Sequence, residues 1–169
     1  MRRLIVLVGA SGSGKTAVAQ VLEQRAPWTG HTHHFDSIGV PSAEEMAKYG
    51  GGEGWQKWAT EKWLEELARK DLPLQLLEGQ TRPSFIHPVL DAYPRLRVDT
   101  ILLDSRPDVR RRRLVALRDQ AELASPVMDS WAAYLRGQAD ALGLRVIDTS
   151  DLSVAEVAGE IESFVSRQD

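Results

Sequence analysis

The sequence predicts a three-layer α/β/α fold, with about five parallel strands and helices on both faces of the sheet. Three observations support this prediction. The continuous apolar run LIVLV at 4–8 is typical of a strand that is buried on both faces. Segments rich in β-forming residues then alternate with helical patterns along the chain, which favours parallel strands joined by crossover helices. Residues 1–169 suit one domain, since they show no internal repeat or linker.

The predicted elements follow each other in a regular order. Strands are predicted at 4–8, 31–36, 72–79, 98–104 and 144–149. Helices are predicted at 16–26, 55–70, 83–93, 107–123, 126–143 and 153–168, with a short helix inside a loop at 38–49. Pro107 marks the start of one helix and Gly143 the end of another, while Ser153 and Glu156 form the pattern of a capping box.

The composition excludes several classes of function. The chain has no cysteine, which excludes disulfides, thiolate metal sites and a cysteine nucleophile, and which fits a cytoplasmic protein. The net charge of −3 gives no general attraction for nucleic acid or membranes, so neither is expected as a partner. No segment approaches the roughly 18 apolar residues that a membrane-spanning helix needs. We expect a monomer or a homodimer.

One motif carries specific chemistry. Residues 9–16 read GASGSGKT and match the pattern G-x-x-x-x-G-K-[ST] in full. Small residues between a strand and a helix let backbone N–H groups surround a phosphate, and the helix N-terminus adds positive charge. Lys15 is expected to reach the β- and γ-phosphates, and Thr16 to offer its hydroxyl to Mg²⁺. The predicted nucleotide site comprises Gly9, Ala10, Ser11, Gly12, Ser13, Gly14, Lys15 and Thr16.

The sequence favours ATP over GTP as the nucleotide. A guanine site of the GTPase type uses an Asn-Lys-x-Asp segment, and this chain contains no asparagine. DSIG at 36–39 does match the D-x-x-G of a GTPase switch. Without the guanine-reading segment, we interpret that match as a coincidence.

From the phosphate-binding motif onward, the order of motifs resembles the small P-loop kinases, a group that includes adenylate kinase, gluconate kinase, shikimate kinase and chloramphenicol phosphotransferase. The resemblance covers most of the chain by the order of its motifs rather than by close sequence identity. It implies a P-loop NTPase fold and ATP-dependent phosphoryl transfer to a small molecule.

Three residues take roles that this resemblance implies. Asp36, at the end of the second predicted strand, would position the acceptor hydroxyl or take its proton. In the segment LLEGQTRP, Glu78 falls where adenylate kinases have an aspartate that steadies the water shell of Mg²⁺. Arg82 falls where they have an arginine that grips the phosphate of the acceptor. The segment departs from that family in its glutamate and at Gln80-Thr81.

The resemblance also places a lid over the nucleotide at 106–125. Within it, Arg118 falls at the position of a lid arginine of adenylate kinases, and Arg113 lies within one position of a second. Successive helical residues point about 100° apart, so only one or two of the four arginines at 110–113 can face a site. The segment VIDTSDLS resembles the one whose backbone touches the adenine ring.

The resemblance also implies an acceptor-binding flap at 37–70, and the flexible glycine-rich segment GGGEG at 50–54 would be its hinge. Trp55, Trp58 and Trp63 follow at a helical spacing that predicts a core-facing stripe. In the alternative interpretation, Trp55 or Trp58 stacks on the acceptor.

Three histidines in the second predicted strand could suggest a metal site. No carboxylate or fourth ligand is evident near His31, His33 and His34, so edge or packing roles are predicted for them instead.

These patterns together predict a P-loop kinase that uses ATP and Mg²⁺. Asp36 favours an acceptor hydroxyl, such as that of a sugar acid, a nucleoside or an antibiotic-like alcohol. Arg82 favours the alternative of a nucleoside monophosphate kinase, but the predicted flap has no clear second arginine. An alternative from another class is an ATPase switch or a nucleotide-dependent binding module.

Overall fold

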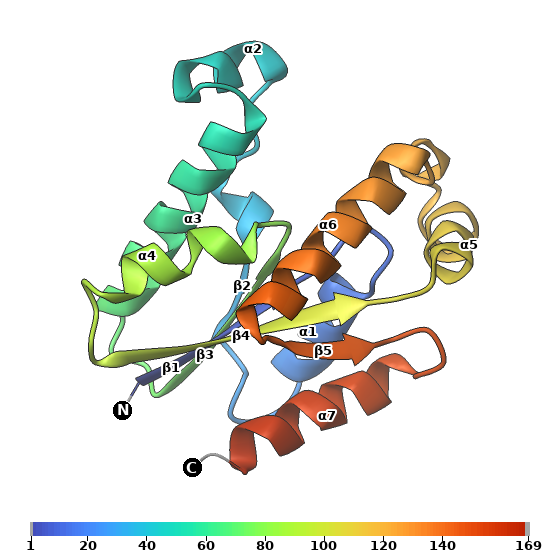
Figure 1. Ribbon diagram of the computed structural model, residues 1–169. Helices are drawn as coiled ribbons and strands as arrows, with labels where there is room; N and C mark the ends of the chain where they lie inside the picture. The colour runs from blue at the N-terminus through green and yellow to red at the C-terminus, as the bar shows by residue number, and fades with distance from the viewer. Residues whose placement is uncertain (1, 168–169) are drawn as a thin grey trace.

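The computed structural model describes residues 2–167, and the side chain of Arg118 lies outside the described part. Within that part, one sheet of five parallel strands has the order β2-β3-β1-β4-β5 (Figure 1). The strands are β1 (Arg2–Val8), β2 (Thr32–His34), β3 (Leu74–Gly79), β4 (Leu96–Asp104) and β5 (Arg145–Asp148).

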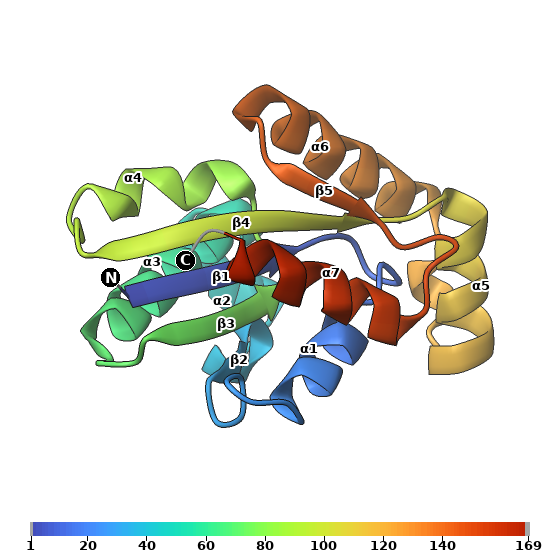
Figure 2. The ribbon, with the colours of Figure 1, turned by 90° about the horizontal axis from the view of Figure 1, so that it is seen from below.

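Helices cover both faces of the sheet, which confirms the predicted three-layer fold. They are α1 (Lys15–Glu23), α2 (Ala43–Met46), α3 (Gly52–Arg69), α4 (His87–Leu90), α5 (Pro107–Arg118), α6 (Pro126–Leu142) and α7 (Val154–Ser166). Helices α1 and α7 lie on one face, α3, α4 and α6 lie on the other, and α5 stands beyond the carboxyl ends of the strands (Figure 2). No helix in residues 2–167 has both the length and the apolar character needed to cross a bilayer.

The central strand β1 contributes to two separate hydrophobic cores. Leu4, Val6 and Val8 are buried with side chains of α3 and α6, whereas Ile5 and Leu7 are buried with side chains of α1 and α7. Because successive side chains of a strand point to opposite faces, a strand covered on both sides must be apolar at every position. The apolar run LIVLV at 4–8 is continuous because both faces of β1 are covered.

The second strand is shorter than predicted. It ends at His34, and Phe35–Ile38 form a 3₁₀ turn. Phe35 is only 1% exposed, and its carbonyl accepts a hydrogen bond of 2.9 Å from the indole Nε1 of Trp63 on α3. This contact turns the chain out of the sheet before Asp36, so the aspartate lies in the turn and not in the strand.

The glycine-rich segment at 50–54 is not a separate linker. Gly51 has a φ of 100°, in the left-handed region that favours glycine, and Gly52–Gly54 form the first turn of α3. A Cβ added at Gly54 would lie 1.8 Å from the carbonyl oxygen of Tyr49. The glycines therefore allow a tight packing of α3 on the chain before it, and the flexible hinge predicted at 50–54 stays a prediction.

Three predicted helices end earlier than expected, and the one predicted at 16–26 stops at Glu23. The helix predicted at 107–123 stops at Arg118, because Asp119 adopts a left-handed conformation with φ 50°. The helix predicted at 83–93 is divided into a 3₁₀ turn at Pro83–Phe85 and the short α4. The predicted capping box of Ser153 is present at the start of α7.

Candidate active site

The phosphate-binding motif forms a tight loop, here called the phosphate loop (residues 9–16), between β1 and α1. A Cβ added at Gly9 would lie 2.4 Å from the carbonyl oxygen of Leu103 on β4, so this position must be glycine. A Cβ at Gly12 would lie 3.0 Å from the carbonyl oxygen of Arg110 on α5. Gly14 has a φ of 98° and caps α1. The loop is thus enclosed by β4 and α5.

Lys15 lies inside this loop. Its side chain is almost entirely buried, and its Nζ donates a hydrogen bond of 3.1 Å to the backbone carbonyl of Ala10. The ammonium group therefore lies over the backbone of the loop, next to the N-terminus of α1. A cation and a helix N-terminus at one loop make a site for an anion.

Thr16 and Glu78 are brought together from α1 and β3. The Thr16 hydroxyl lies 3.3 and 3.4 Å from the two carboxylate oxygens of Glu78, which is buried at the end of its strand. A hydroxyl and a carboxylate are oxygen ligands of the kind that Mg²⁺ takes, with phosphate and water oxygens filling the other positions. The described residues contain no cluster of three acidic or histidine side chains that would hold a metal alone. The pair thus fits a Mg²⁺ ion that is shared with a bound phosphate.

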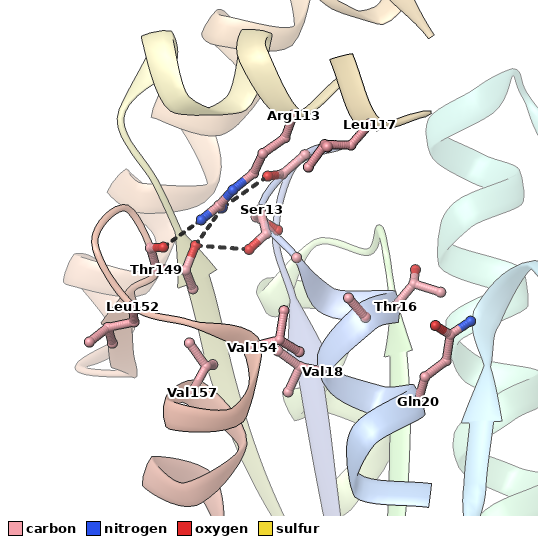
Figure 3. Close-up of a pocket in the computed structure, with 13 residues that line it drawn as sticks. Ser13, Thr16, Val18, Gln20, Arg113, Leu117, Thr149, Leu152, Val154 and Val157 are labelled. Carbon is pink, nitrogen blue, oxygen red and sulfur yellow. Dashed lines mark hydrogen bonds between the residues drawn. The ribbon is translucent and has the colours of Figure 1, made fainter. Parts of the chain in front are cut away.

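Arg113 joins α5 to the phosphate loop and to the segment after β5. Its guanidinium donates to the carbonyl of Gly12 at 3.3 Å and to the hydroxyl and carbonyl of Thr149 at 3.0 and 2.6 Å. The Thr149 hydroxyl donates in turn to the carbonyl of Ser13 at 2.9 Å (Figure 3). Burial and the neighbouring charge of Arg112 lower the pKa of Arg113 below its ordinary value.

The other arginines of the run have different surroundings. Arg110 is 4% exposed and donates to the carbonyl of Ser105 and to Asp129 on α6. Arg111 binds the other oxygen of the same carboxylate, and Arg112 is exposed. Among the described residues, Arg113 is the one of the four whose side chain donates a hydrogen bond to the phosphate loop, and Arg110 is buried in an ion pair, so the number of arginines that face a site stays a prediction. Arg118 lies outside the described side chains, so its predicted role stays a prediction.

A cavity of about 280 Å³ lies beside the phosphate loop. Its walls include Ala17 and Gln20 of α1, Leu117 of α5, and Leu152 and Val154 after β5 (Figure 3). These walls are largely apolar, which suits a flat heterocyclic base. The cavity meets the phosphate loop at one end, so a single nucleotide would span both features. The segment VIDTSDLS contributes to this cavity, where the sequence predicted an adenine contact.

Asp36 lies in the turn at the carboxyl end of β2, the edge strand beside β3. Its side chain is exposed and makes no hydrogen bond to another described residue. The neighbouring Phe35 anchors the turn in the core, where its ring packs edge-on against Trp55 with centroids 6.1 Å apart. Trp55 and Trp63 are buried as the core-facing stripe predicts, and Trp58 is partly buried against Tyr49.

Arg82 bridges α3 and α6. It donates to the side-chain oxygen of Gln56, pairs with Glu53 at 3.2 Å, and lies 4.9 Å above the ring of Trp131. Tyr134 adds a second ring of α6 at 5.6 Å. Among the described residues, Arg82 is not in contact with Asp36 or with the phosphate loop.

Two contacts of the site escaped the sequence analysis. The His34 Nδ1 lies 2.7 Å from the Glu78 carboxylate, because β2 and β3 pair in a register that places these residues side by side. The Gln80 side-chain amide donates to the hydroxyl of Ser11 at 2.6 Å. Neither contact could be predicted without knowing the order of the strands in the sheet, because each joins residues that are far apart in the sequence.

Comparisons with known proteins confirm the fold. No family model matches the sequence, and no curated protein matches it. Among solved structures, a shikimate kinase from Acinetobacter baumannii in complex with shikimate matches with a TM-score of 0.67 at 18% identity, over 100% of this chain and 96% of that one. A gluconokinase from Sinorhizobium meliloti 1021 matches with a TM-score of 0.73 at 16% identity, over 99% and 95%.

A third structure is of a protein that is named for a different function. The tunicamycin resistance protein of Deinococcus radiodurans matches with a TM-score of 0.64 at 20% identity, over 98% of this chain and 96% of that one. The chain therefore has the fold of the P-loop small-molecule kinases over its whole described length. The identities are low, so these likenesses define the fold and leave the acceptor to be argued from the site.

Proposed function

We propose that this protein transfers a phosphoryl group from ATP to a hydroxyl of a small molecule. The observation that carries the proposal is the convergence on one loop of a buried lysine, a hydroxyl–carboxylate pair and an arginine. Phosphoryl transfer needs positioning and charge neutralisation more than covalent chemistry from the protein, and these groups supply both.

Each group has a distinct role in this proposal. The amides of the phosphate loop and Lys15 hold the phosphates, and the cavity beside α1 holds the base. Thr16 would bind Mg²⁺ directly and Glu78 would bind its water shell, so that the ion offsets phosphate charge when it is present. Arg113 closes the nucleotide side of the site, and Asp36 positions the acceptor hydroxyl.

The surroundings of Arg82 support a hydroxyl acceptor over a nucleoside monophosphate. The guanidinium already pairs with Glu53 and Gln56 and is covered by Trp131, so an acceptor phosphate would have to displace an existing carboxylate. Glu53 is 67% exposed, so its ion pair with Arg82 is weak and an acceptor phosphate could displace it. A nucleoside monophosphate kinase therefore remains the alternative function. Sugar acids, nucleosides and antibiotic-like alcohols are the acceptor classes that we propose.

The test is a screen of these acceptors for ADP release with Mg²⁺ and ATP. We expect one class to stimulate ADP release well above the background hydrolysis of ATP. Lys15→Met is the control, and it should abolish the stimulated rate because it removes the ammonium group from the loop. Nucleoside monophosphates form a separate arm that tests the alternative kinase. If the wild type binds ATP but no compound accelerates ADP release, the ATPase switch replaces the kinase.

A further inference from the structure

Gln80 reaches the phosphate loop from the acceptor side of the sheet. It follows directly after β3, and its side-chain Nε2 donates a hydrogen bond of 2.6 Å to the Ser11 hydroxyl. Ser11 is 8% exposed and lies within the part of the loop that precedes Lys15. Gln80 is itself only partly buried.

The end of β3 brings Glu78 and Gln80 to the phosphate loop. Successive side chains of a strand point to opposite faces, so Glu78 and residue 79 face opposite sides of the sheet, and Gln80 is the first residue after the strand. Residue 79 must be glycine, since a Cβ there would lie 2.2 Å from the Cβ of Phe35. Glu78 contacts Thr16 at one end of the loop and Gln80 contacts Ser11 toward the other. A phosphate chain bound in the loop therefore has these two side chains beside it.

The backbone of Gln80 is fixed by α3. Its carbonyl accepts a hydrogen bond of 2.7 Å from the Gln56 amide, and the next hydroxyl, on the buried Thr81, bonds to Thr60. Arg82 then donates to the Gln56 side chain. Residues 80–82 are thus all bonded to α3. These bonds fix the backbone from which the Gln80 side chain extends before any ligand binds.

We propose that the Gln80 side-chain amide donates a hydrogen bond to the terminal phosphoryl group of the nucleotide. This inference rests on the proposed function, and it makes Gln80 a catalytic residue that approaches the nucleotide from the acceptor side. Nε2 carries two N–H groups, and Ser11 takes one of them in the described residues. An uncharged donor at this position stabilises the oxygens of the transferred group without competing with Mg²⁺ for the carboxylate of Glu78.

The test compares a nucleotide that has the terminal phosphoryl group with one that lacks it. Calorimetric titrations with Mg²⁺ use ADP and the non-hydrolysable analogue AMP-PNP, so no acceptor is needed. Gln80→Met should leave the affinity for ADP unchanged and weaken that for AMP-PNP about 10- to 100-fold, as expected for a hydrogen bond to a charged group. Gln80→Glu should weaken AMP-PNP further, because a carboxylate would face the phosphate.

Two further variants separate a direct contact from a structural one. Ser11→Ala removes the partner of the existing hydrogen bond, and we expect it to change the affinities for ADP and AMP-PNP by the same factor. Gln138→Met is the matched control, since this glutamine bonds to Ser84 and Tyr134 away from the loop. It should change neither affinity.

The outcomes distinguish this inference from the function on which it rests. Failure of the wild type to bind either nucleotide would remove the proposed function itself. If the wild type binds both and Gln80→Met lowers their affinities equally, the phosphoryl contact is wrong and the proposed function stands. If Ser11→Ala reproduces the selective loss of AMP-PNP affinity, Gln80 acts through Ser11 and the direct contact is also wrong.

Discussion

Asp36, the residue proposed to position the acceptor, depends on buried neighbours for its place. Asp36 is exposed in its turn, and the turn is held by Phe35 beneath it and by the indole of Trp63. The carboxylate is therefore placed by packing and not by hydrogen bonds of its own. This arrangement leaves Asp36 accessible to a ligand and separate from the phosphate loop.

Asp36→Asn should lower turnover with the acceptor about 10²- to 10⁴-fold, since the amide cannot take a proton from the hydroxyl. The affinity for ATP should remain nearly unchanged, because Asp36 makes no contact with the phosphate loop. The measurements are the turnover number with the screened acceptor and calorimetric binding of ATP. An unchanged turnover number would remove Asp36 from the mechanism.

Gly79→Ala should destabilise the protein by about 1–3 kcal/mol, because the added Cβ would lie 2.2 Å from the Cβ of Phe35. Gly137→Ala in α6 is the matched control, since no atom lies within 4 Å of its added Cβ. That change should stabilise the helix by about 0.5–1 kcal/mol. Urea denaturation of both variants measures the effects, and equal effects would contradict the close approach at residue 79.

At the scale of elements, α5 is attached to the rest of the site by arginines with separate tasks. Arg113 binds the phosphate loop and the segment after β5, whereas Arg110 and Arg111 share Asp129 at the start of α6. A lid built on α5 would therefore move together with the start of α6, or would have to break the ion pairs of Arg110 and Arg111 with Asp129.

Arg110→Met should cost about 1–3 kcal/mol of unfolding free energy, because it removes the hydrogen bonds that a buried guanidinium donates to the carbonyl of Ser105 and to Asp129. Arg112→Met is the control from the same helix, and it should change stability by less than about 0.5 kcal/mol because that side chain is exposed. Urea denaturation compares the two. A larger loss for Arg112→Met would contradict the assignment of the arginines.

The Asp129 carboxyl should make stability depend on pH. Burial alone would raise its pKa, but hydrogen bonds from Arg111 and Arg110 outweigh burial and hold the pKa below the ordinary value of 3.8. A carboxyl with a lower pKa in the folded state adds stability above its unfolded pKa and loses it as the pH falls through the folded value.

The comparison of wild type with Asp129→Asn checks this sign. The advantage of the wild type in unfolding free energy should be fully present above pH 4 to 5 and should shrink on acidification below pH 3.8. Urea denaturation at a series of pH values measures it. A constant difference over the whole series would show that the charge of Asp129 does not matter.

At the scale of the whole molecule, the proposed nucleotide site joins elements of one face of the sheet, α1 and α7, with elements at its carboxyl edge. The phosphate loop, α5 and the segment after β5 meet through Arg113 and Thr149. A ligand that contacts all of them should hold the folded state together.

Mg²⁺ and ATP at 100 times the dissociation constant should add about 2.7 kcal/mol of unfolding free energy. For a chain of 169 residues, this corresponds to an increase of about 5–10 °C in the melting temperature. Thermal unfolding with and without the ligand measures the shift, and Lys15→Met should remove most of it. An unchanged melting temperature of the wild type would oppose the nucleotide site.

Local patterns were sufficient to predict the fold class and the glycine-rich loop between β1 and α1. A strand buried on both faces must be apolar throughout, and a phosphate loop must combine glycines with one lysine, so both leave a mark on consecutive residues. The capping box of Ser153 is visible for the same reason. The early end of α5 was not predicted, since a left-handed Asp119 has no strong sequence signal.

The sequence by itself therefore determined the alternation of strands and helices and the anion-binding loop, because these depend on neighbours along the chain. Only the tertiary structure decided which distant residues share the site. The strand order β2-β3-β1 places Glu78 between Thr16 and His34, and it aims Gln80 at Ser11 across 69 positions of sequence. Such contacts depend on strand order and register, which arise from the packing of the whole sheet and leave no local pattern.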